Sequence, residues 1–173
     1  VCGLVAISAF AVAVIVCRMM PQMMVRCINW LVAHTLYKLR VEGKENLPKT
    51  GGALIICNHV AYVDPPLLLA SVDRPIRFLM YRPIYDAPLV RPIARLMRAI
   101  PIAPEDNRRD LVTALNEAKD ALKNGEIVCI FAEGALTRLG HMLKFERGFE
   151  VIMKGVDVPI IPAFIDQVWG SIF

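Results

Sequence analysis

The stretch ALIICNHVAYVDPP, residues 53–66, places an apolar run directly before one histidine and one aspartate, His59 and Asp64. The run Ala53–Cys57 is rich in aliphatic side chains and predicts a buried β-strand. The pair Asp64-Pro65 is typical of a helix start, because aspartate favours the N-cap and proline the first helical position. The stretch therefore predicts a strand, a short loop that carries His59, and a helix.

The same alternation of strands and helices continues over residues 40–173 and indicates an α/β domain. Further strands are predicted at Ile76–Met80, Ala99–Ile102, Ile127–Phe131 and Val158–Phe164, with a weak one near Val41. Helices are predicted at 65–71, 88–97 and 109–123, and Asn124-Gly125 ends the last of them.

The N-terminal part, residues 1–39, has a different character. The chain has 173 residues, is 56% hydrophobic and carries a net charge of +4. Residues 1–17 contain no charge, and this length is near the lower limit for a membrane span, which needs about 20 apolar residues. We expect a transmembrane, re-entrant or interfacial helix, with a buried core helix as the alternative. Because the chain begins with Val rather than Met, we also expect it to be part of a longer protein.

Residues 21–39 predict an amphipathic helix that begins at Pro21. Its polar side carries Gln22, Arg26 and Asn29, and Arg40 follows on the same side. The opposite side carries Met24, Ile28, Leu31, Val32, Leu36 and Leu39. Such a helix lies on a membrane or packs its apolar side on the domain. Residues 1–41 contain four basic and no acidic residues, which favours an anionic lipid surface. No nucleic-acid-binding signature accompanies this charge, so we expect no nucleic acid partner.

The cysteines and histidines do not indicate a metal site or a disulfide framework. The five cysteines form no C-x-x-C pair and lie in apolar surroundings, which is typical of reduced, buried thiols. The three histidines have no ligand-like spacing, so no metal is expected.

The pair His59 and Asp64 is a candidate for acid–base chemistry. A loop at the carboxyl end of a strand is where α/β proteins usually place their sites. Asp64 either only caps the following helix or also reaches back to the imidazole, where it would fix the ring tautomer and stabilise the imidazolium. The loop contains no serine, and Cys57 belongs to the strand. We therefore expect His59 to act on a substrate hydroxyl rather than to activate a protein nucleophile.

Two further motifs accompany this pair: FAEG at residues 131–134 and VPIIP at residues 158–162. Together, N-H-x-x-x-x-D, F-x-E-G and V-P-x-x-P in this order resemble the glycerolipid acyltransferase family, typified by lysophosphatidic acid acyltransferases. The resemblance covers roughly residues 40–166. It implies the family's fold, a mixed β-sheet flanked by helices.

The resemblance also implies a reaction and its residues. A fatty acyl group would pass from a thioester, acyl-ACP or acyl-CoA, to a glycerol hydroxyl of a lysophospholipid, with no bound cofactor. His59 would be the base and Asp64 its partner. The residues implied in substrate binding are Asn58, Glu133, Gly134, Thr137 and Arg138. Membrane lipids and the acyl carrier would be the partners, and the expected location is the inner (cytoplasmic) membrane, with the site facing the cytoplasm.

The sequence departs from the pattern of phosphatidic-acid-forming members at two positions. Pro104 and Leu136 stand where those members carry arginines that grip a phosphate monoester. The segment EGALTRLGHMLKFERG and the ending WGSIF look more like the branch that acylates 2-acylglycerophosphoethanolamine, which is often fused to a transporter and an acyl-ACP synthetase. We therefore expect lysophosphatidylethanolamine as the acceptor. The alternatives are a lysophosphatidate acyltransferase and a non-catalytic, membrane-bound lipid-binding domain.

Overall fold

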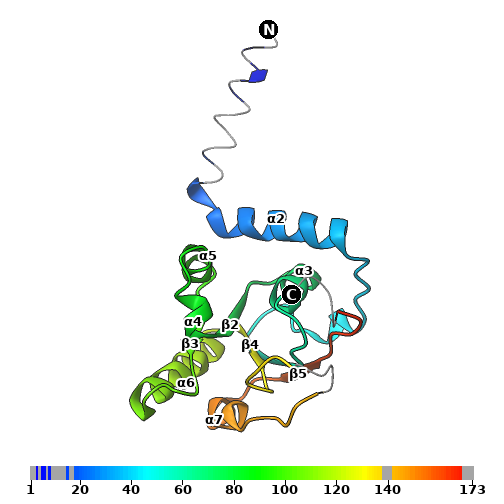
Figure 1. Ribbon diagram of the computed structural model, residues 1–173. Helices are drawn as coiled ribbons and strands as arrows, with labels where there is room; N and C mark the ends of the chain where they lie inside the picture. Colours follow the sequence, from blue (N-terminus) through cyan, green and yellow to red (C-terminus); the bar gives the residue numbers. More distant parts are fainter. Residues whose placement is uncertain are drawn as a thin grey trace.

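A five-stranded sheet forms the centre of the molecule in the computed structural model, which describes residues 3, 5, 6, 8, 15, 18–137 and 142–168 (Figure 1). Its strands lie in the order β3-β2-β4-β1-β5. Their bounds are Ala53–Cys57 (β1), Ile76–Tyr81 (β2), Ile100–Ile102 (β3), Ile127–Phe131 (β4) and Ile160–Ala163 (β5). β1 and β4 have the predicted bounds, and β5 is shorter than predicted.

Every strand pair in the described sheet is parallel, so the expected mixed sheet is not what forms. The reason is that each connection between consecutive strands contains a helix, and helical crossovers join parallel strands. These helices are α3 (Asp64–Ser71), α4 (Arg82–Tyr85), α5 (Arg91–Leu96), α6 (Arg108–Lys123) and α7 (Gly148–Met153).

The helices between strands differ from the prediction in two places. The helix predicted at 88–97 forms over a shorter range as α5, and the short helix α4 before it was not predicted; each has a proline in its first turn. Proline is favoured there because it lacks the N–H that a helix start leaves unbonded. The short helix α7 was not predicted, and the weak strand near Val41 does not form; the 3₁₀ turn Lys44–Asn46 (η1) follows instead.

Two apolar cores cover the two faces of the sheet. On one face, Leu54 and Val128 pack with Leu115 and Leu122 of α6 and Ile152 of α7. On the other face, strand residues that include Ile55, Cys57 and Phe78 pack with Leu68 and Leu69 of α3. Successive strand residues point to opposite faces, which is why Leu54 and Ile55 enter different cores. Figure 1 shows α6 and α7 on one side of the sheet and α3 on the other.

Helix α2 (Pro21–Leu36) lies outside α3 and turns its polar side toward the domain. Gln22 donates to the carbonyl of Leu96 at 2.7 Å, and Asn29 donates to the carbonyl of Pro66 at 2.8 Å. Arg26 donates to three carbonyls, those of residues 72, 73 and 74. The alternative in which the apolar side packs on the domain is therefore wrong, because the contacts with the domain are made by the polar side.

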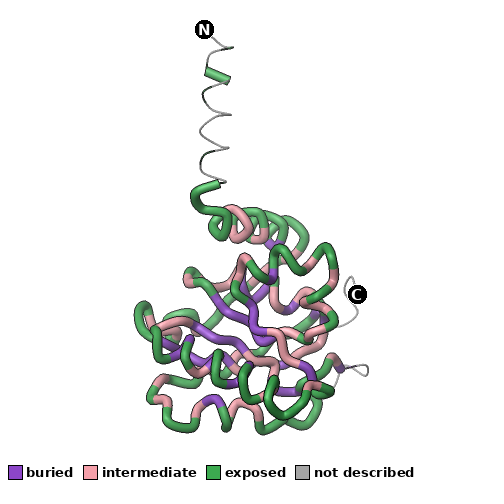
Figure 2. The backbone as a smooth tube through the Cα atoms, turned by 90° about the vertical axis from the view of Figure 1, so that its left-hand side faces the viewer, coloured by how far each residue is buried: buried purple, intermediate pink, exposed green. Residues whose placement is uncertain are grey.

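The outer side of α2 is apolar and exposed, and Figure 2 shows this helix, mostly green, at the surface of the molecule. Its exposed large side chains are Met23, Ile28, Trp30, Leu31, Val32 and Leu36. Within the described ranges, no helix has both the length and the apolar character that crossing a bilayer requires. The expectation for residues 1–17 falls mostly outside the described residues.

Candidate active site

The candidate site forms where β1 and β4 end side by side. Their parallel register pairs Cys57 with Phe131, so the residues that follow each strand emerge at the same edge of the sheet. The loop after β1 carries His59, and the turn after β4 carries Glu133. Two motifs separated by more than seventy residues are thus brought together, as the carboxyl edge of a parallel sheet requires.

Asp64 holds the His59 loop through one carboxylate oxygen. Its Oδ2 accepts a hydrogen bond from His59 Nδ1 at 2.8 Å and from the backbone N–H groups of Val60 and Ala61 at 2.7 and 2.9 Å. Asp64 is fully buried. Helix α3 begins at Asp64 itself and its N-cap is Val63, so the expected capping role of Asp64 is wrong. The carboxylate turns back to the preceding loop and orients the imidazole.

The ring of His59 is held on a second side by Phe131. The two rings stack with centroids 4.1 Å apart and an angle of 19° between their planes. The side chain of His59 is 18% exposed, and no described group bonds its Nε2. Because Nδ1 faces Asp64, the neutral ring carries its proton on Nδ1 and keeps the Nε2 lone pair free. This is the arrangement that a general base needs.

Glu133 fastens the His59 loop to the segment after β4. Its Oε1 accepts the N–H of His59 at 2.9 Å, and its Oε2 accepts the N–H of Leu143 at 2.7 Å. The residue is 4% exposed. Both carboxylate oxygens are therefore engaged with backbone, which favours a positioning role. The contact of Glu133 with substrate stays a prediction.

Asn58 fastens the same loop to the chain that leaves β5. Its side chain donates from Nδ2 to the carbonyl of Ile165 at 2.9 Å and accepts the N–H of Ile165 at Oδ1 at 2.7 Å. The amide thus imitates one rung of a β-ladder beyond the ends of β1 and β5. Asn58 is buried, so its geometry also favours positioning over the predicted substrate contact.

The other predicted binding residues lie on the turn after β4. Gly134 has a φ of +66° and its N–H donates to the carbonyl of Phe131, a left-handed turn that favours glycine. Thr137 is buried and its N–H donates to the carbonyl of His59 at 3.2 Å. Arg138 lies outside the described residues. Substrate binding by these three residues stays a prediction.

Cys57, next to this loop, cannot serve as a nucleophile at neutral pH. Burial, followed by the negative charge of Asp64, raises the pKa of the Cys57 thiol to about 12. A thiol reacts as its thiolate, which is scarcely populated five pH units below such a value. Cys57 is therefore not a candidate nucleophile, and the catalytic role of His59 stays a prediction.

Two contributors to the site were missed at the sequence level. Phe131 was noted as part of FAEG but was given no role, although the register of two adjacent parallel strands would place it beside Cys57, two residues before His59. Ile165 acts through its backbone, which leaves no side-chain signal; only its place just after VPIIP connects it to the site.

Replacing Asn58 with aspartate is expected to lower the free energy of unfolding by about 1–3 kcal/mol, because the half-buried Ile165 carbonyl loses its donor. Chemical denaturation followed by circular dichroism measures the change. Asn116→Asp, at an exposed position on α6, is the matched control and should stay within about 0.5 kcal/mol of the parent chain. Equal denaturation midpoints for Asn58→Asp and Asn116→Asp would contradict a stabilising role of the bonds between Asn58 and Ile165.

Comparison with known proteins places this geometry in a family. The family model described as Acyltransferase matches residues 38–166. A "1-acyl-sn-glycerol-3-phosphate acyltransferase" of Borreliella burgdorferi is 30% identical over 81% of this chain and 56% of its own length. The chloroplastic LPAT1 enzyme of Arabidopsis thaliana, with the same activity in its name, is 28% identical over 75% of this chain and 36% of its own length.

A solved structure agrees with these matches. The crystal structure of the 1-acyl-sn-glycerophosphate acyltransferase PlsC from Thermotoga maritima superposes with a TM-score of 0.66 at 26% identity, over 83% of this chain and 58% of that one. The chain thus spans from about a third to less than two thirds of the length of these relatives. By the extent of the family match, the chain belongs to the Acyltransferase family.

Proposed function

We propose that this chain carries the acyl-transfer site of an O-acyltransferase that acts on a lysophospholipid. The observation that carries the proposal is the 2.8 Å bond from His59 Nδ1 to the buried Asp64 carboxylate, with Nε2 left free at the carboxyl edge of the sheet. The family match supports acyl transfer, and the names of the relatives support a glycerolipid acceptor.

The proposed reaction uses His59 twice. Its Nε2 takes the proton of a glycerol hydroxyl while that oxygen attacks the carbonyl carbon of an acyl thioester, on acyl carrier protein or coenzyme A. Asp64 stabilises the imidazolium that results. When the tetrahedral intermediate collapses, the carbon–sulfur bond breaks and the imidazolium returns its proton to the departing thiolate. The ester and the free thiol are the products, and His59 is neutral again.

Substitution His59→Ala tests the proposal directly. Acyl transfer to a lysophospholipid should fall about 10²- to 10⁴-fold, the usual contribution of a general base. The matched control is Asn116→Ala, because Asn116 is exposed on α6, away from the site and from the outer side of α2, and should leave the rate unchanged. Mass spectrometry of the acylated product gives the rate. Equal rates for His59→Ala and the parent chain would exclude His59 as the base.

For the acceptor, the relatives favour lysophosphatidate, since their names specify 1-acyl-sn-glycerol-3-phosphate, and we propose it as the first candidate. Lysophosphatidylethanolamine is the second, favoured by Pro104 and Leu136 at the expected arginine positions. Arg82, the first residue of α4, is held by Asp106 in two hydrogen bonds of 2.8 Å, so its charge is already paired. Lysophosphatidylethanolamine is a phosphodiester whose phosphate carries one negative charge. It therefore needs less positive charge in the site than lysophosphatidate, which is a phosphate monoester.

A competition assay with equal amounts of the two lysolipids separates these candidates. We expect lysophosphatidate to be consumed with the higher kcat/KM. The variant Leu136→Arg should widen this preference by roughly tenfold, about the effect of one additional charged hydrogen bond. Consumption of lysophosphatidylethanolamine alone would instead support the phosphoethanolamine branch, for which a fused transporter and acyl-ACP synthetase remain proposals.

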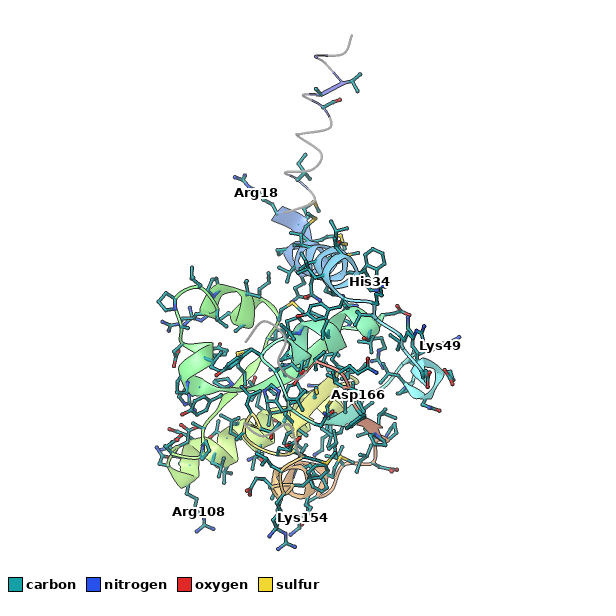
Figure 3. All side chains as sticks on the ribbon, turned by 45° about the vertical axis from the view of Figure 1, so that its right-hand side comes forward. Arg18, His34, Lys49, Arg108, Lys154 and Asp166 are labelled. Atoms are coloured by element: carbon teal, nitrogen blue, oxygen red, sulfur yellow. The ribbon has the colours of Figure 1, made fainter. Side chains whose placement is uncertain are left out.

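We also propose that the outer side of α2 rests on the cytoplasmic face of the inner membrane. The polar side of α2 already makes hydrogen bonds with the domain. Its apolar side includes Trp30, a residue favoured at the level of the lipid headgroups. Figure 3 shows Arg18 near this end of the molecule, with Arg108 and Lys154 at the far end. A cation beside an apolar face is suited to anionic lipid.

Fluorescence quenching by brominated lipids measures this contact at a single residue. The chain has two tryptophans, so Trp169→Phe leaves Trp30 as the only emitter. We expect vesicles of brominated phosphatidylglycerol to quench it strongly. The control combines Val112→Trp with Trp30→Phe and Trp169→Phe, which moves the emitter to an exposed position on α6, at the opposite end of the molecule from α2. Equal quenching of both emitters, or of neither, would contradict the proposed face.

A further inference from the structure

Two buried polar atoms in the described part of the chain lack a hydrogen-bond partner: the hydroxyl of Tyr37 and Oδ1 of Asp64. One is an O–H donor and the other is a carboxylate acceptor, so they are complementary. Burying either atom unpaired is costly, and nearly all buried polar groups in folded proteins are satisfied by protein or by ordered water.

The packing of α2 on α3 brings these atoms to the same region. Arg26 bonds the carbonyls of residues 72–74 at the end of α3, whereas Asn29 bonds that of Pro66 near its start. The two helices therefore run in opposite directions. Two turns beyond Asn29, the chain reaches Tyr37 on the side of α3 where Asp64 and the His59 loop lie.

A small apolar cluster confirms this placement. Its buried members are Ala33, Ala61, Leu67 and Val168. Tyr37 packs against it together with Val60 and Val63, which flank Ala61 in the loop that Asp64 holds. Tyr37 thus belongs to the same cluster as Val60 and Val63, which lie between His59 and Asp64 in the chain, and its hydroxyl oxygen is buried.

We infer that the Tyr37 hydroxyl is linked to Asp64 Oδ1 through one buried water molecule, which makes Tyr37 a positioning residue for the His59–Asp64 pair. The two atoms do not bond directly, and a polar contact beyond direct reach is commonly bridged by one ordered water. The inference rests on the proposed function for its effect on rate, but not for its structural part.

The link has a definite consequence for His59. Oδ2 of Asp64 already accepts three donors, and a donor on Oδ1 draws negative charge away from the oxygen that faces the imidazole. Removing the Tyr37 hydroxyl therefore strengthens the pull of Oδ2 on the Nδ1 proton and frees the carboxylate to turn. The stronger bond to Oδ2 changes the NMR shift of the Nδ1 proton. The freedom of the carboxylate to turn loosens the orientation of the His59 ring.

The test is the Tyr37→Phe variant of the full chain, with Tyr85→Phe on α4 as the matched loss of a hydroxyl. In proton NMR, the His59 Nδ1–H resonance should move downfield in Tyr37→Phe and stay in place in Tyr85→Phe. In the acyl-transfer assay, kcat should fall about three- to tenfold with KM unchanged, the loss expected for one hydrogen bond.

The outcomes separate the link from the proposed function. A moved resonance supports the link even when the parent chain shows no acyl transfer. The absence of acyl transfer would contradict only the proposed function. An unmoved resonance overturns the link, whether or not kcat falls. Should Tyr37→Phe fail to fold, the parent chain labelled with 3-fluorotyrosine carries a stronger hydroxyl donor and should move the resonance upfield; an unchanged resonance there also overturns the link.

Discussion

One oxygen atom, Oδ2 of Asp64, accepts N–H groups from three residues of a single short loop. Two of these donors are backbone groups and the third is the imidazole of His59. A buried carboxylate is costly unless it is bonded in this way, so the loop must close around Asp64 for the fold to form. The same closure sets the direction of the His59 ring. Folding and the orientation of His59, the proposed base, therefore depend on one contact.

The loop is held from both neighbouring strands as well. Glu133, after β4, binds the N–H of His59, and Asn58 binds the backbone of Ile165 after β5. Phe131, the last residue of β4, stacks on the imidazole. A site that is oriented by packing and hydrogen bonds before substrate arrives avoids the cost of ordering the base during the reaction. Asn58 and Glu133, which the sequence suggests as substrate ligands, thus hold the His59 loop in place in this structure.

Much of the sheet could be predicted because the pattern of its strands is local. The aliphatic runs at 53–57 and 127–131 are bounded by polar residues and glycine, and they form strands with those bounds. The His59–Asp64 contact was foreseen because the spacing of five residues at a helix start limits where the carboxylate can go. The all-parallel arrangement was missed because it depends on α7, a six-residue helix too short to show a period.

The orientation of α2 and the partners of Asn58 and Glu133 could not be read from the sequence for a different reason. An amphipathic pattern shows that a helix has two sides, but not which side meets the domain. Here carbonyls at the ends of α3 and α5 accept the polar side, and those acceptors leave no mark in the sequence. Backbone acceptors and donors also complete the clamps around His59, and only the fold decides which of them come within reach.

The tautomer of neutral His59 decides whether this ring is built as a base, because that role requires Asp64 to hold the proton on Nδ1 and leave the Nε2 lone pair free. Long-range ¹H–¹⁵N correlation NMR of the full chain above the titration of the ring identifies the protonated nitrogen. We expect a protonated Nδ1 and an unprotonated Nε2 in His59. A proton on Nε2, with Nδ1 bare beside the Asp64 carboxylate, would contradict that role.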